Sequence, residues 1–223
     1  MEHPVLTTIG REGFVTLGWF EPGSGDGVPA AADGAKTRQV VLIGNAGPAM
    51  YQRFAREADP VRDLMDDWSR AAIDPLAGQL GGRAVYPFDK PPLAFLTWAK
   101  RARAGFTSPL GMNIHPVYGL WHAFRAALLF PVVFDLPQPS ASASPCDACA
   151  GRPCLTACPV GAFDGERYDV DACARHLRSA AGAPCMTGGC LARHACPVGA
   201  AYRYAPAQAG FHMAAFLKAR QGR

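Results

Sequence analysis

The run Cys146-Asp-Ala-Cys149-Ala-Gly-Arg-Pro-Cys154-Leu-Thr-Ala-Cys158-Pro-Val-Gly-Ala162 decides the fold of the C-terminal part of this 223-residue chain. Its last cysteine opens the phrase Cys-Pro-Val-Gly-Ala, which returns at residues 196–200. All eight cysteines lie between residues 146 and 196. Thiolates are soft donors, and such a density of them predicts iron–sulfur ligation.

The spacing C-x2-C-x4-C-x3-C-P resembles the run of the bacterial two-cluster ferredoxins, in which the fourth cysteine ligates the other cluster. The resemblance implies two [4Fe-4S] clusters with crossed ligands. One cluster would be held by Cys146, Cys149, Cys154 and Cys196, and the other by Cys158, Cys173, Cys185 and Cys190. The gap after Cys149 and the second half of the pattern are wider than in those ferredoxins. A missing, labile or three-iron cluster therefore stays an alternative.

Two other uses of cysteine fit the pattern less well. Disulfides need an oxidising compartment, and the N-terminus Met1-Glu-His-Pro4 lacks the basic and apolar regions of a secretory signal. Structural zinc prefers paired C-x2-C knuckles, and the cysteines form one such knuckle, Cys146/Cys149. The longest apolar run, 126–134, contains Pro131 and is far shorter than the roughly 20 residues of a membrane span. We therefore expect reduced thiols, a cytoplasmic location and no membrane insertion.

A segment rich in proline and serine at 136–145 is predicted to link two domains, 1–135 and 146–223. Stretches rich in β-branched and aromatic residues predict strands at 13–20, 39–43 and 121–134, with a loop at 21–35. Helices are predicted at 49–58, 61–73, 93–104 and 170–180, the last capped by Asp169 or Asp171. The segment 145–162 parallels 184–200, which implies pseudo-twofold symmetry. The predicted fold class is α+β.

The stretch from Arg103 to Arg125 resembles the nitroreductase-related domain of the CblC-type cobalamin-trafficking chaperones and of epoxyqueuosine reductase. In the chaperones, a segment of the form His-Pro-x-x-Gly-x-Trp-x-x-x-Arg lies beside the corrinoid. Epoxyqueuosine reductase joins a similar domain to a two-cluster ferredoxin domain in the same order, with an extra cysteine that corresponds to Cys173. The resemblance implies a nitroreductase/CblC-like α/β domain at 1–135.

The same resemblance implies cofactor-binding roles for His115, Gly119, Trp121 and Arg125, which reproduce the corrinoid-side pattern together with the proline at 116. From the residues alone, Trp121 is a core side chain first and a pocket residue second. Arg125 is as well explained as a buried salt-bridge partner as by ligand binding. The reductase resemblance implies an acidic proton donor shortly before the Arg-Ala-Gly run, where Asp89 lies. The alternative for Asp89 is a helix cap before the Pro-Pro pair.

These patterns predict an electron-transfer protein that passes single electrons between two clusters and a pocket of the N-terminal domain, occupied by a corrinoid. A redox partner protein is expected. The alternatives are a ferredoxin-like carrier, an epoxyqueuosine reductase-like tRNA-modifying enzyme, and a flavin in place of the corrinoid. Residues 1–145 carry 13 basic and 13 acidic side chains, which argues against a tRNA partner, so no nucleic acid is expected. Residues 146–223 carry 9 basic and 5 acidic side chains, and anionic clusters would offset this excess of positive charge.

Overall fold

The computed structural model describes residues 3–60, 64–137 and 143–220, and its backbone contacts divide the chain into two compact units. The first unit comprises Met1–Gly105 and His122–Ser142, and the second comprises Phe106–Trp121 and Ala143–Arg223. The segment 106–121, which we expected in the N-terminal domain, therefore belongs to the unit that carries the cysteines. Part of the predicted linker, 138–142, lies outside the described residues.

The first unit is built on a four-stranded antiparallel sheet in the order β1 (Val15–Phe20), β2 (Gln39–Ala46), β6 (His122–Phe130) and β3 (Arg83–Val85). The two central strands are the most buried, because their apolar runs 40–43 and 126–130 are fully enclosed. Strand β6 ends immediately before Pro131, which lacks the N–H that a ladder needs. The three predicted strands are confirmed, and the short β3 was not foreseen.

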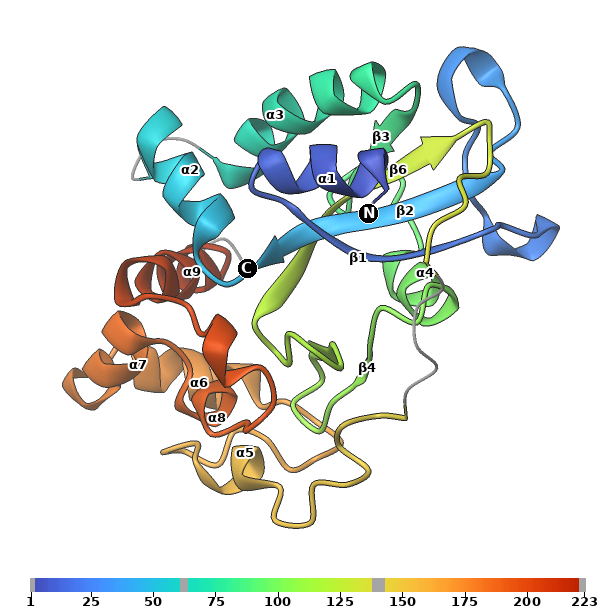
Figure 1. The fold of residues 1–223 in the computed structure, drawn as a ribbon. Coiled ribbons are helices and arrows are strands. Elements are labelled where there is room, and N and C mark those ends of the chain that lie inside the picture. Colours follow the sequence, from blue (N-terminus) through green and yellow to red (C-terminus); the bar gives the residue numbers. More distant parts are fainter. Residues whose placement is uncertain (1–2, 61–63, 138–142, 221–223) are drawn as a thin grey trace. The chain divides into compact units, whose positions relative to one another are not determined.

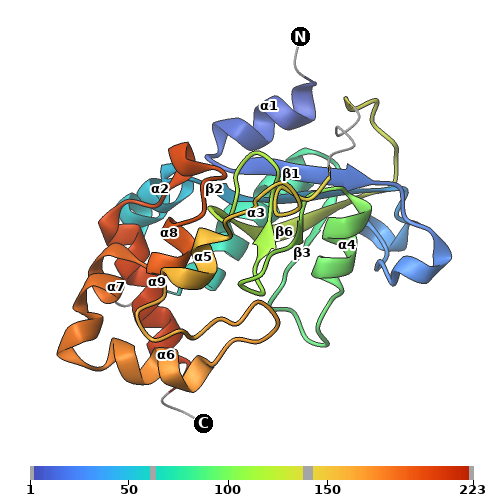
Figure 2. The ribbon, with the colours of Figure 1, turned by 90° about the horizontal axis from the view of Figure 1, so that it is seen from below.

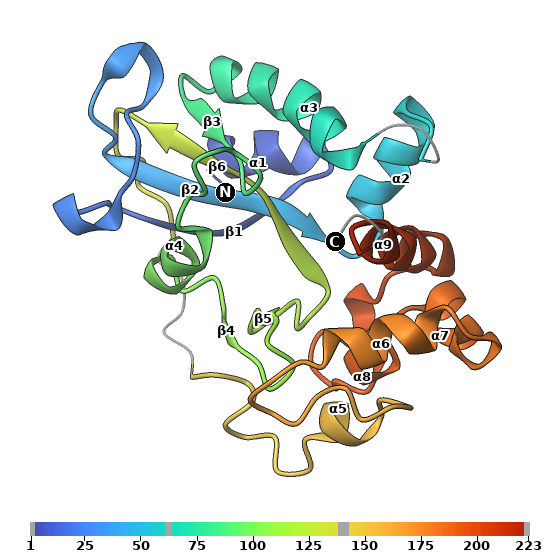
Figure 3. The ribbon, with the colours of Figure 1, turned by 180° about the vertical axis from the view of Figure 1, so that it is seen from behind.

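Four helices flank this sheet. Helices α1 (Pro4–Arg11) and α3 (Met65–Gln79) lie on one face and α4 (Phe95–Arg101) on the other, as Figures 1 and 3 show, while α2 (Ala49–Glu57) follows β2. The predicted helices at 49–58 and 93–104 are confirmed with shorter ends. The predicted helix at 61–73 runs further than expected, and its proposed start at 61–63 lies outside the described residues. Helix α1 was not predicted. The loop predicted at 21–35 contains two 3₁₀ turns, Ser24–Asp26 and Ala32–Gly34.

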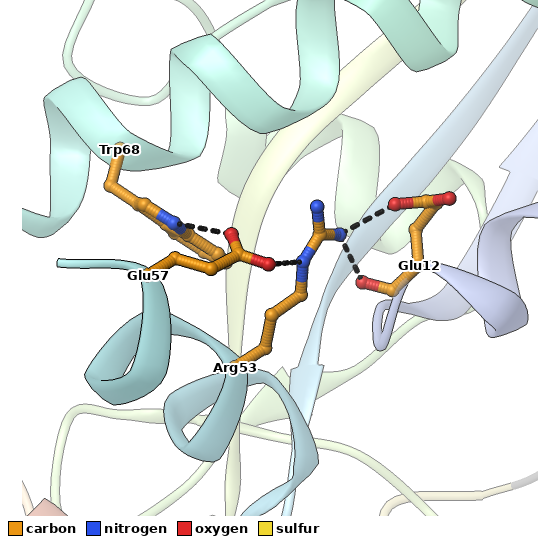
Figure 4. A network of polar contacts seen from close by, with 4 residues as sticks. All are labelled: Glu12, Arg53, Glu57 and Trp68. Atoms are coloured by element: carbon orange, nitrogen blue, oxygen red, sulfur yellow. Dashed lines mark hydrogen bonds and ion pairs between the residues drawn. The ribbon is translucent and has the colours of Figure 1, made fainter.

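A polar network ties α1, α2 and α3 together (Figure 4). Arg53 on α2 donates to the Glu12 carboxylate at 2.6 Å and to the Glu57 carboxylate at 2.8 Å. The indole N–H of Trp68 on α3 donates to the other Glu57 oxygen at 3.1 Å. The Arg53 side chain is 22% exposed, whereas its partners Glu12 and Glu57 are 41% and 45% exposed, so the network is only partly shielded from solvent.

The second unit consists of short elements. They are β4 (Phe106–Thr107), β5 (Asn113–Ile114), α5 (Pro153–Thr156), α6 (Val170–Leu177), α7 (Ala183–Gly188), α8 (Leu191–His194) and α9 (Pro206–Lys218), with 3₁₀ turns at Ala180–Gly182 and Ala200–Tyr202. Helix α7 packs along α9, and α5 packs against α8 (Figure 2). The helix predicted at 170–180 is α6. Its cap is Asp169, whose Oδ1 accepts the N–H of Ala172 at 2.8 Å.

Helices α5 and α8 are the equivalent elements of the two copies of the sequence repeat. Each of the two helices is four residues long and ends two residues before a Cys-Pro doublet, at Cys158 and at Cys196. Their mutual packing places the two copies side by side within the second unit. The mixture of helices with a small antiparallel sheet confirms the expected α+β class. No helix among the described residues has both the length and the apolarity that crossing a bilayer requires.

Candidate metal centre

Four cysteines from both copies of the repeat line one cavity of the second unit. They are Cys146, Cys149, Cys154 and Cys196, here called group A. The remaining wall comes from the turn after β4, which includes Ser108, and from prolines that flank the cysteines. Group A thus combines three cysteines of the first copy with one of the second, as the crossed assignment requires.

Burial raises the pKa of Cys146, Cys154 and Cys196 in group A, and the charges of neighbouring cysteines raise it further. For Cys154, burial is the largest cause, followed by the charges of Cys196, Cys146 and Cys149. For Cys146, burial is again first, a hydrogen bond from Ser144 opposes it, and the charges of Cys196 and Cys149 add to it. Thiolates this close repel one another, so all four lose their protons together only when a cationic partner compensates them.

The other four cysteines, Cys158, Cys173, Cys185 and Cys190, form a second set, here called group B. After burial, the nearby charges that raise the pKa of Cys173 are those of Cys158 and Cys185. For Cys190, burial comes first and the corresponding charges are those of Cys173 and Cys185. Cysteines that raise the pKa of a group B thiol therefore belong to group B. In the same way, cysteines that raise the pKa of a group A thiol belong to group A.

Backbone N–H groups point at several of the sulfurs. The N–H of Ala162 donates to Cys158 Sγ at 3.3 Å. Backbone donors also stabilise the thiolates of Cys190 and Cys196, through the N–H groups of Arg193 and Val198. Hydrogen bonds of this kind favour the charged form of sulfur, which is the form that binds a metal.

The chemistry of the donor sets fits an iron–sulfur cluster. All eight cysteines are free, and each group offers four soft sulfur donors of the kind that such clusters use. As it stands, no group of three or more His, Cys, Asp or Glu side chains among the described residues is arranged to hold a single metal ion. The Ser108 hydroxyl, buried in the wall of group A without a partner among the described residues, fits a site that would supply an acceptor.

Three of the four residues predicted to contact a corrinoid lie in the second unit and pack within it. His115 pairs with Gly119 in an antiparallel bridge, and its Nδ1 accepts two backbone N–H groups of the turn between them. Trp121 is 1% exposed, and its ring lies 5.4 Å from that of Tyr204 and 4.5 Å from the guanidinium of Arg193. These contacts are those of a packed core, which was the first interpretation of Trp121 from the residues alone.

Gly119 lies against the Cys-Pro loop of group A. A Cβ on Gly119 would lie 2.0 Å from the carbonyl oxygen of Val198, and one on Gly199 would lie 2.3 Å from the Tyr118 carbonyl group. The two backbones therefore cross without room for a side chain. The turn 115–119 thereby holds the loop that carries Cys196, a role that the sequence pattern did not reveal.

Arg125 and Asp89 belong to the first unit. Arg125 on β6 donates through Nε to Asn45 Oδ1 on β2 at 3.1 Å. Asp89 accepts the backbone N–H of Tyr86 at 2.8 Å and a guanidinium N–H of Arg70 at 2.6 Å. Asp89 does not cap the helix after the Pro-Pro pair, because α4 begins at Phe95 with Ala94 as its N-cap. The predicted roles of Asp89 in catalysis and of Arg125 in cofactor binding stay predictions.

Sequence reasoning assigned no role to three residues beside the cysteines: Ser108, Tyr168 and Arg193. The guanidinium of Arg193 lies between the rings of Trp121 and Tyr204, 4.5 Å from each, and donates to the Leu120 carbonyl oxygen at 2.9 Å. Ser108 and Arg193 carry no local sequence signal, because the residues that they contact lie far away in sequence.

No family model and no curated protein matches the chain. Solved structures of epoxyqueuosine reductase are similar to it. A selenomethionine-labelled form is 20% identical over 78% of this chain and 52% of that chain, with a TM-score of 0.46. The enzyme from Streptococcus thermophilus is 13% identical over 87% of this chain and 65% of that chain, with a TM-score of 0.49. A complex of the reductase with an epoxyqueuosine-modified tRNA-Tyr stem loop is 21% identical over 76% of this chain and 50% of that chain, with a TM-score of 0.46. The chain spans about half the length of the first of these, and similarities below a TM-score of 0.5 assign no residue roles.

Proposed function

We propose that this protein is an iron–sulfur electron-transfer protein whose second unit holds two [4Fe-4S] clusters, one on group A and one on group B. The observation that carries the proposal is the grouping of eight free cysteines into two sets of four, each containing members of both repeat copies. When bound, the clusters would supply one-electron transfer at low potential.

The chain's own residues supply what such clusters need. Groups A and B provide four soft donors each, and backbone N–H groups stabilise Cys158, Cys190 and Cys196 as thiolates. The buried apolar residues Leu110, Ile114 and Leu120, with Phe163, pack around the cysteines and limit the access of water and oxygen. Low exposure to solvent is one of the factors that set cluster potentials.

Iron counting on paired substitutions tests the crossed assignment. Anaerobically purified protein is expected to hold about eight irons and eight sulfides per chain. The double variant Cys154→Ala/Cys196→Ala should lose one cluster, because both residues belong to group A. The matched control Cys190→Ala/Cys196→Ala should lose both clusters. If the ligands instead followed one another in sequence order, Cys154→Ala/Cys196→Ala would lose both clusters and Cys190→Ala/Cys196→Ala only one.

A corrinoid is the electron acceptor that the sequence resemblance suggests, and we carry it as the finer part of the proposal, together with a protein redox partner. It has a separate test, because it depends on residues 115–125 rather than on the cysteines. Cobalamin titrated into the anaerobic protein should shift its visible bands on binding. An unchanged spectrum at micromolar excess would remove the corrinoid and leave the two-cluster proposal intact.

A further inference from the structure

Two hydroxyl groups of the second unit lie beside the cysteine groups, one at each. Ser108 lines the cavity of group A. Tyr168 packs against the apolar cluster around Phe163, as do Cys158, Cys173 and Cys190 of group B. Neither side chain is expected to ligate iron, and the sequence pattern indicated no role for either. A role for these hydroxyls at the clusters rests on the proposed function, since it requires that both clusters are bound.

The side-chain hydroxyl of Ser108 makes no hydrogen bond to the turn that contains it. The backbone N–H of Ser108 donates to the Met112 carbonyl, and its carbonyl accepts the N–H of Gly111, both at 2.9 Å, so the main chain is fixed between β4 and β5. The residue is 5% exposed, and its Oγ has no hydrogen-bond partner among the described residues. A buried hydroxyl without a partner is costly, and the sulfurs of group A, which would be thiolates in the presence of a cluster, line the same cavity.

Tyr168 makes the corresponding contact at group B. Its main chain pairs with Phe163 in an antiparallel bridge, and the two rings stack with centroids 4.5 Å apart and planes inclined by 13°. The stack orients the ring, and the Tyr168 hydroxyl is within hydrogen-bonding reach of the Cys173 sulfur. A phenolic O–H donates and a cysteine sulfur accepts, so Tyr168 is the donor of this pair.

We propose that Ser108 and Tyr168 tune the reduction potentials of the two clusters, Ser108 by donating a hydrogen bond at group A and Tyr168 at group B. One-electron reduction adds one negative charge to a cluster and its thiolates, and no proton is transferred. An O–H donor interacts more strongly with the more negative, reduced state. Each hydroxyl therefore raises the potential of its own cluster and leaves the other unchanged.

The test is an anaerobic potentiometric titration of the full-length protein with dithionite as the one-electron reductant. Wild-type protein should show two one-electron waves. Ser108→Ala should move one wave to lower potential and Tyr168→Phe the other. Each shift should correspond to at least a tenfold fall in the equilibrium constant for reduction, about 59 mV for one electron. Ser108→Thr, which keeps the hydroxyl, should restore the wild-type wave.

Thr156→Val is the matched control, because it removes a hydroxyl of α5 that already donates to the Pro153 carbonyl at 3.2 Å. It should leave both waves in place. Iron counts on every variant separate failure of the proposed function from failure of the tuning role. Wild-type protein without about eight irons refutes the proposed function itself. Eight irons with unmoved waves, or with both variants moving the same wave, refutes only the tuning role. Loss of iron from Ser108→Ala and Ser108→Thr alike would make Ser108 structural and also refute it.

Discussion

The crossing of the turn at Gly119 over the Cys196 loop makes Gly119→Ala the most informative single substitution in this chain. Gly119 has φ +57, and a Cβ there would lie 2.0 Å from the Val198 oxygen and 2.6 Å from its carbonyl carbon. Contacts below 3.0 Å essentially never occur for real Cβ atoms, so one backbone must move. Val198 lies two residues after Cys196 and its N–H supports that sulfur, so the movement displaces a ligand of group A.

The cost has two parts. A left-handed backbone costs alanine about 1–2 kcal/mol relative to glycine. Overpacking against an enclosed neighbour adds about 1–3 kcal/mol or more. Gly161 offers a control for the first part alone, because it has φ +58 in the other Cys-Pro-Val-Gly loop and nothing within 4 Å of its ideal Cβ. We therefore expect a total of about 2–5 kcal/mol for Gly119→Ala and about 1–2 kcal/mol for Gly161→Ala.

The assay combines metal content with thermal scans at one fixed rate, because cofactor proteins often unfold irreversibly. Gly119→Ala should fall from about eight to about four irons per chain, since group B is untouched, and its apparent midpoint should drop well below that of Gly161→Ala. Gly161→Ala should keep both clusters. Equal iron contents and equal midpoints for the two variants would refute the reasoning, because the close approach at Gly119 would then have no consequence.

Three further predictions concern stability. Arg53→Met should lower the free energy of unfolding of the first unit by about 0.5–1.5 kcal/mol in denaturant titrations, because it breaks two partly exposed ion pairs, and no change would mean that these pairs do not contribute to stability. The hydrogen bond from Arg53 is the largest cause of the lowered pKa of Glu57, so ionised Glu57 stabilises the fold fully above the unfolded pKa of about 4.3, and this stabilisation is lost as the pH falls through the lower folded pKa. Glu57→Gln should flatten the pH dependence of the unfolding midpoint in that acidic range, and an unaltered pH profile would contradict the assignment. Asp169→Ala should cost about 1 kcal/mol by removing the cap of α6, more than the first-turn control Asp171→Ala, and the opposite order would show that the cap is unimportant.

The sequence by itself determined the features that are encoded locally. Stretches rich in β-branched and aromatic residues located β1, β2 and β6. A segment of helical character, with Asp169 or Asp171 as its cap, located α6, and the structure selects Asp169. Cysteine type and spacing pointed to iron–sulfur chemistry and, through the ferredoxin resemblance, to the crossed ligand sets, which stay a prediction; the structure shows that the four cysteines of group A line one cavity. Short segments carry these signals because strand and helix periodicity, capping and ligand softness act within a few residues.

Only the tertiary structure decided which elements meet. Residues 106–121 pack with the cysteine segment rather than with the sheet, so that Gly119 lies against Val198 and Ser108 lines the group A cavity. In sequence, the same turn motif had indicated a corrinoid contact. The physical reason is that a close backbone crossing or a buried hydroxyl depends on a partner far away in the chain, and neither leaves a periodic trace in the sequence around it.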